Sequence, residues 1–207
     1  MKQLSTYITE GLKIGKKYRQ NKTYNYHPKD KDELRKIIEQ LLEERGDDAD
    51  LNDIDASEIT DMSNLFWGLD PHNIDISDWD VSNVTSMAGV FWNCTNFDSD
   101  LSEWDVSNVT DMTAMFYWCK KFNSNLSKWD VSNVKSIMSM FANCYNFNSD
   151  LSDWNVSNVN NMDGCFMNCR NFNQDLNDWN VNSNTHNMDY IFYGCERLIN
   201  KPSWFSC

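Results

Sequence analysis

The sequence predicts an α/β repeat solenoid, a right-handed coil in which each turn carries one short parallel strand and one short helix. Two observations lead to this prediction. A set of apolar residues recurs every 25 positions, and the polar residues between them vary freely. The clearest column contains Trp79, Trp104, Trp129, Trp154 and Trp179. Because a 25-residue segment cannot enclose a core by itself, we expect these side chains to line one interior shared by stacked units.

Further columns keep the same spacing. The phenylalanine column contains Phe91, Phe116, Phe141 and Phe166, followed one position late by Phe192. The cysteine column contains Cys94, Cys119, Cys144 and Cys169, with Cys195 also one position late. A degenerate copy precedes Trp79, so residues 54–198 are predicted to form six units.

Each unit contains two patterns that indicate secondary structure. The stretch LSEWDVS, from Leu101, alternates apolar and polar residues, which favours a short strand. The stretch TDMTAMFYWC follows, and its apolar residues are spaced by three and four, which favours a short helix capped by Thr110. The stretch KKFNSNLS is typical of a return turn.

The two ends differ from the repeats. Residues 1–53 form an N-terminal segment that contains a predicted amphipathic helix over 31–46. The apolar face of this helix contains Leu34, Ile37, Ile38, Leu41 and Leu42. We expect it to cover the first coil, since terminal coils would otherwise expose core. Residues 199–207, with Pro202, Trp204 and Phe205, are predicted to form a C-terminal cap.

Charge limits the classes of partner. The net charge is −13, and residues 54–207 hold seven basic and twenty acidic residues. Such a surface repels phosphate backbones, which argues against nucleic-acid binding. It is compatible with a basic protein partner, but a solvated surface that has no charged partner is the commoner reason for such acidity.

No apolar run is long enough to span a membrane. The first twenty residues, MKQLSTYITEGLKIGKKYRQ, lack the apolar core of a secretory signal. We therefore expect a cytoplasmic or virion-associated protein rather than a secreted one.

The stretch WDVSNVTDMTAMFYWCKKFNSNLS, from Trp104, resembles the repeat of BspA-type leucine-rich-repeat surface proteins of bacteria, mycoplasmas and protists. The resemblance covers about residues 54–198. It implies a leucine-rich-repeat-like fold, a role in adhesion or protein binding, and no catalytic residues. Members are usually exported, whereas this sequence shows no export signal.

Repeated polar residues admit a structural and a chemical interpretation. The cysteines are expected to be buried free thiols rather than disulfides or zinc ligands. Stacked aspartates could bind calcium, but we expect each one to cap a turn of its own coil. The aspartates concerned are Asp80, Asp105 and Asp130, and more loosely Asp100, Asp150 and Asp175. The asparagine column Asn83, Asn108, Asn133 and Asn158 is expected to bridge adjacent coils. No cofactor or metal is predicted.

Large aromatic residues occupy positions that the repeat does not require. These candidate partner-binding residues are Trp67, Trp92, Tyr117, Trp118, Tyr145 and Tyr193. The alternative is that they pack neighbouring coils together. The sequence shows no active-site constellation, so we expect a non-enzymatic protein-interaction module. A second hypothesis is a structural component of a phage virion or cell-surface complex, docked through the N-terminal segment.

Overall fold

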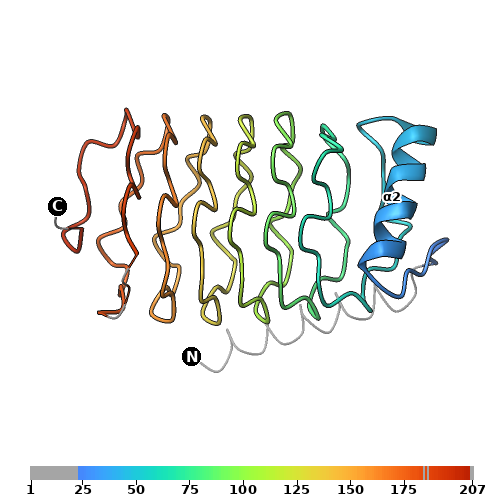
Figure 1. The fold of residues 1–207 in the computed structure, drawn as a ribbon, viewed down its shortest axis with the longest axis horizontal. Helices are drawn as coiled ribbons and strands as arrows, with labels where there is room; N and C mark the ends of the chain where they lie inside the picture. Colours follow the sequence, from blue (N-terminus) through green and yellow to red (C-terminus); the bar gives the residue numbers. More distant parts are fainter. Residues whose placement is uncertain (1–22, 184, 186, 206–207) are drawn as a thin grey trace, which may run out of the picture.

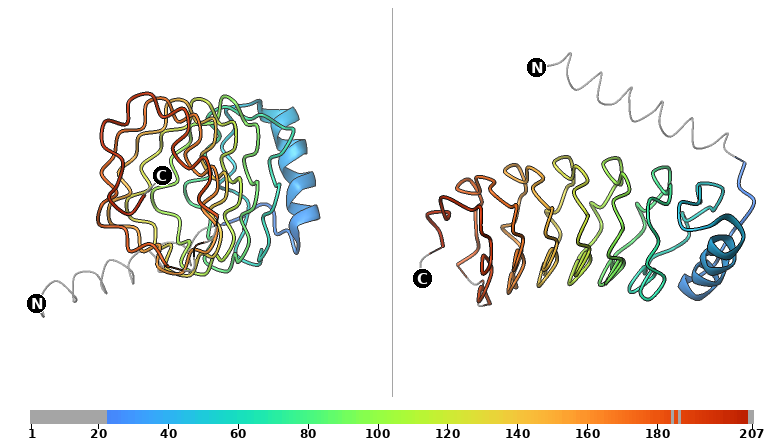
Figure 2. Two further views of the ribbon diagram at one scale, coloured as in Figure 1. Left: turned by 60° about the vertical axis from the view of Figure 1, so that its left-hand side comes forward. Right: turned by 90° about the horizontal axis from the view of Figure 1, so that it is seen from above.

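The computed structural model describes residues 23–183, 185 and 187–205. Successive segments of the chain wind into coils that are stacked in sequence order, with one helix at the N-terminal end of the stack (Figures 1 and 2). Residues 1–22 of the predicted N-terminal docking segment, together with His186 and Cys207, lie outside the described residues.

The predicted α/β class, with a strand and a helix in each coil, is wrong. Within the described residues, α2 (Lys31–Arg45) is the one helix, and the β-bridges between coils are isolated parallel ones that form no sheet. One column of bridges runs through Asp61, Ser86, Asp111, Ser136, Asn161 and Asn187. The structure is therefore not a solenoid of strands and helices, and it does not support the leucine-rich-repeat features expected from the sequence.

The stretch predicted as a repeat helix is a series of tight turns. Alternate amides in it, those of Met115, Tyr117 and Cys119, donate to the carbonyl three residues back. The amides between them donate to the next coil, from Ala114, Phe116 and Trp118 to Met138, Met140 and Ala142. An α-helix needs every amide to bond four residues back, so these partners exclude one.

Left-handed residues enforce this path. Ala114 has φ 53° and Trp118 has φ 65°, values that a right-handed helix cannot contain. The same two positions are left-handed in neighbouring coils, at Asn64, Gly68, Gly89, Asn93, Ser139, Asn143, Gly164 and Asn168. Glycine and asparagine adopt this conformation at the lowest cost, which explains their frequency in the two columns.

The stretch predicted as a strand is also built from turns. The amide of Trp104 donates to the Leu101 carbonyl at 3.2 Å, and that of Val109 donates to Val106 at 2.9 Å. Each turn directs one apolar side chain inward, and Leu101, Trp104 and Val106 are all buried. The alternation of apolar and polar residues in the sequence therefore follows the successive turns of a coil. It does not mark the two faces of a strand.

Aromatic rings form the core of the stack. Phe116 stacks on Phe91 at 5.5 Å and on Phe141 at 5.6 Å, between ring centroids. Within its own coil it packs against Phe122 at 3.9 Å. All four rings are fully buried. The recurring large residues thus line one interior, as the sequence predicts.

The tryptophan column adds a hydrogen bond at every step. The indole nitrogen of Trp129 donates to the Leu101 carbonyl of the preceding coil at 3.0 Å. Trp204 continues the column, because it stacks on Trp179 at 6.0 Å and donates to the Leu176 carbonyl at 2.7 Å. The segment predicted as a C-terminal cap therefore places Trp204 where a further coil would begin.

Helix α2 closes the other end. Asp30 caps its first turn by accepting from the Glu33 amide at 2.9 Å, and Gly46, at φ 86°, ends it. Its residues Leu34, Ile38 and Leu41 are fully buried in the same core as the first coils. The helix lies where the sequence places one, over 31–46, and it covers the first coil.

Replacing Trp129 with phenylalanine should lower the free energy of unfolding by about 1–3 kcal/mol, because the buried Leu101 carbonyl loses its donor while the ring stack is kept. Urea unfolding followed by tryptophan fluorescence measures the change. Trp204→Phe removes the same kind of bond at the half-buried end of the column, so it should cost less than about 1 kcal/mol. Equal losses in the two variants would contradict a shared, buried ladder.

Candidate binding surface

The recurring asparagines and aspartates hold the backbone. The side-chain amide of Asn133 donates to the Ser107 carbonyl of the preceding coil at 2.7 Å, and the rest of its column does the same. The predicted bridge between coils is confirmed. Asp105 accepts from both the amide and the hydroxyl of Ser107, at 3.1 and 2.6 Å, and so caps a turn of its own coil.

The other recurring aspartates make the same local contact. In each case the carboxylate accepts a hydrogen bond from the backbone amide two positions later. The aspartates that do so are Asp80, Asp100, Asp130, Asp150 and Asp175. In the part of the chain that the structure describes, no three His, Cys, Asp or Glu side chains gather closely enough to hold a metal ion. The carboxylates of the aspartate columns therefore already act as hydrogen-bond acceptors within turns.

Added calcium or EDTA should leave the melting temperature unchanged to within about 1 °C, because each carboxylate already accepts hydrogen bonds within its own turn. Differential scanning fluorimetry of the protein with each additive measures this. A rise of several degrees with calcium that EDTA reverses would show that the aspartate columns bind the ion.

The cysteine column is equally structural. The thiols of Cys119, Cys144 and Cys169 are fully buried, and each donates to a phenylalanine carbonyl of the preceding coil at 2.9–3.0 Å. All six described cysteines are free. Burial raises the pKa of the Cys94 thiol to about 12 and that of the three others well above the ordinary 9.0. Such thiols are poor nucleophiles and poor metal ligands.

These raised pKa values predict an alkaline loss of stability. Thiols of the unfolded chain ionise near pH 9.0, whereas the folded ones stay protonated to about pH 12 in the case of Cys94. The contribution of the thiols to the free energy of unfolding should therefore be constant below pH 9 and fall above it, by about 1.4 kcal/mol per pH unit for each buried thiol. Urea titrations across this range test it. Cys144→Ala should show a shallower fall than the unaltered protein, and identical slopes would exclude the thiols as the cause.

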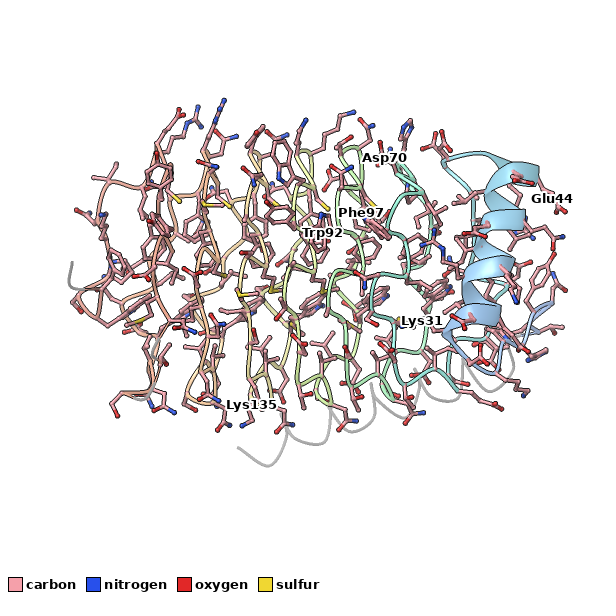
Figure 3. All side chains as sticks on the ribbon, viewed as in Figure 1. Lys31, Glu44, Asp70, Trp92, Phe97 and Lys135 are labelled. Carbon is pink, nitrogen blue, oxygen red and sulfur yellow. The ribbon has the colours of Figure 1, made fainter. Side chains whose placement is uncertain are left out.

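The predicted aromatic residues lie at or near the surface. Trp67, Trp92 and Tyr193 are 58%, 41% and 65% exposed. Tyr117, Trp118 and Tyr145 are half-buried. Figure 3 shows Trp92 in the middle part of the stack, at the residue directly after the core Phe91.

Four of these residues contact one another across three coils. Trp92 meets Tyr117 edge-on at 5.2 Å, and Tyr117 meets Trp118 at 6.4 Å. Trp118 meets Tyr145 at 6.4 Å. We call Trp92, Tyr117, Trp118 and Tyr145 the aromatic strip. No ring contact among the described residues joins Trp67 or Tyr193 to it.

Two cations border the aromatic strip, and the sequence analysis did not identify them. The Lys120 ammonium lies 5.1 Å from the ring centre of Trp118, and the Arg170 guanidinium lies 4.6 Å from that of Tyr145. The signal was present in the repeat, because Lys120, Tyr145 and Arg170 occupy one column at successive 25-residue steps. Only the aromatic member of this column, Tyr145, is among the predicted binding residues.

No helical segment in the described part of the chain combines the length and apolarity that a membrane span needs.

Comparison with known families gives one match. Residues 36–144, and again residues 101–205, match the family described as "Mycoplasma protein of unknown function, DUF285". No curated protein and no solved structure matches the chain. Together the two matched segments run from within α2 to the last described residue, so they include every coil of the stack.

Proposed function

We propose that this chain, which belongs to the DUF285 family, is a non-enzymatic interaction module that binds a protein partner through the aromatic strip. The observation that carries the proposal is that other coils stack with smaller residues at the positions of the strip. The column of Trp92 and Tyr117 continues with Ala142, and Trp118 stands where three coils carry asparagine. Since stacking does not require these rings, a contact with a partner accounts for their size.

The placement of Trp118 supports the same interpretation. A bulky residue at φ 65° is energetically unfavourable, and the equivalent positions use Asn93, Asn143 and Asn168, which tolerate that conformation. A chain selected for stability alone would carry asparagine here too. A strained residue at a half-buried position near the surface is typical of a functional site.

The chemistry of a binding surface fits this part of the molecule. Tryptophan and tyrosine are enriched among the residues that dominate the energy of protein interfaces, because each buries a large area with few rotatable bonds. The aromatic strip is held by ring contacts from three coils, so little side-chain entropy is lost when a partner binds.

The non-enzymatic part of the proposal rests on what the polar residues do. Buried thiols and turn-forming carboxylates are committed to the backbone, as described above, which leaves no obvious nucleophile or base at the aromatic strip. The resemblance to BspA-type repeats, together with the DUF285 match, further supports a repeat protein that acts by binding.

A triple variant tests the proposal: Trp92→Ala, Tyr117→Ala and Trp118→Asn. Each substitution introduces the residue that another coil carries at the same position, so the fold should be kept. Random peptides displayed on phage are selected on the unaltered protein, and the enriched clones are measured on both proteins. We expect the triple variant to lose about tenfold or more in affinity for them.

Trp67→Ala is the matched control, since Trp67 is 58% exposed but lies outside the aromatic strip. It should bind the enriched peptides like the unaltered protein. Circular dichroism and melting temperature verify that all variants are folded. Peptides that bind the triple variant as well as the unaltered protein would refute the aromatic strip as the binding site.

A further inference from the structure

We infer that the aromatic strip and the cations beside it receive an acidic, extended peptide segment of the protein partner. This inference deepens the proposed function and rests on it. It departs from the basic partner with which the overall charge of −13 is compatible, because the relevant charge is the local one.

The cations of the repeats are concentrated beside the aromatic strip. Residues 54–207 contain seven basic residues, and four of them, Lys120, Lys121, Arg170 and Arg197, belong to two adjacent columns of the repeat. Lys121, Arg170 and Arg197 are exposed, and Lys120 is half-buried. We call these four residues the cationic corner. The same two columns hold Asp70 and Glu196, so four positive and two negative charges lie there, in a region that holds twenty acidic residues.

Backbone hydrogen bonds show the order of the cationic corner and Tyr145 along the stack. The Asn146 amide donates to the Lys120 carbonyl, and the Asn171 amide donates to the Tyr145 carbonyl, each at 3.2 Å. The Arg197 amide continues the series to the Arg170 carbonyl at 3.2 Å. Lys120 and Arg170 therefore lie one coil before and one coil after Tyr145.

This order fits a carboxylate-bearing chain that runs along the stack. Neighbouring coils are separated by 5.6 Å at the Phe116–Phe141 rings, so Lys120 and Arg170 are about 11 Å apart along the stack axis. Three residues of a peptide in the extended polyproline II conformation span about 9 Å, and every third side chain then points the same way. A peptide in this conformation with acidic residues at every third position would thus meet both cations.

The existing partner of Arg170 is replaceable. Glu196 pairs with it at 3.5 Å, and both side chains are more than half exposed, at 55% and 67%. Exposed ion pairs contribute little stability, so exchanging Glu196 for a carboxylate of the peptide costs little. The guanidinium can then donate two parallel hydrogen bonds to that carboxylate.

The other basic residues of the repeats either form an ion pair or lie away from the cationic corner. Lys128 is paired with Glu103 through its ammonium group. Lys135 lies at the lower edge of the stack, away from Asp70 at the upper edge (Figure 3). Asp70 belongs to the column of Lys120, because it accepts from Thr95, which stands one 25-residue step before Lys120. Lys128 and Lys135 therefore serve as matched controls.

Fluorescence anisotropy tests the inference with a labelled peptide that carries glutamate at every third position between glycine and serine. A second peptide carries lysine at the same positions. The protein should bind the acidic peptide about tenfold or more tightly than the basic one, and less tightly as salt is added. The Lys120→Glu/Arg170→Glu variant should lose about tenfold in affinity for the acidic peptide. The Lys128→Glu/Lys135→Glu variant has the same net charge and should stay within about twofold.

Three results would overturn the inference. The first is equal or tighter binding of the basic peptide, and the second is an equal loss of affinity in the two double variants. The third is tighter binding of a single-stranded oligonucleotide of similar charge, which would assign the cationic corner to nucleic acid. If the phage-selected peptides depend on the aromatic strip but contain no excess of acidic residues, the proposed function stands and the inference fails. If they do not depend on the strip, both fail.

Discussion

The fold depends on the hydrogen-bond ladder between coils, in which alternate amides of one coil donate to carbonyls of the next, as from Ala114, Phe116 and Trp118. Left-handed residues at two positions in each coil turn these amides outward along the stack. Once the ladder is made, each phenylalanine and tryptophan is brought over its equivalent in the next coil. Regular secondary structure is unnecessary because turns and ladder together satisfy the backbone.

The sequence revealed the period, the shared interior and the helix, because large apolar residues mark all three. It misled on the elements within a coil. Spacings of three and four at Met112, Met115 and Phe116 are typical of a helix, yet a run of four-residue turns produces the same spacing. The distinguishing signal was the pair of columns in which Gly89 and Asn93 stand four positions apart, since both residue types favour left-handed backbone.

The candidate surface was predictable only in part. Aromatic rings such as Trp92 were conspicuous because the repeat offers a smaller residue at the same position. Which of them meet one another depends on the path of the chain, and only four of the six do. The cations at Lys120 and Arg170 were missed because a single charged residue in a variable column looks like any other solvated residue. Their role becomes visible only when the structure places them beside a ring.

The joints between coils are interchangeable, which has an evolutionary consequence. Each indole bonds the same carbonyl of the coil before it, from Trp79 to Trp204, so any coil fits against any other. Unequal recombination that inserts or removes one 25-residue unit preserves every joint. Related genes can therefore change the length of the stack, and with it the number of rings and charges along one edge, without inventing a new fold.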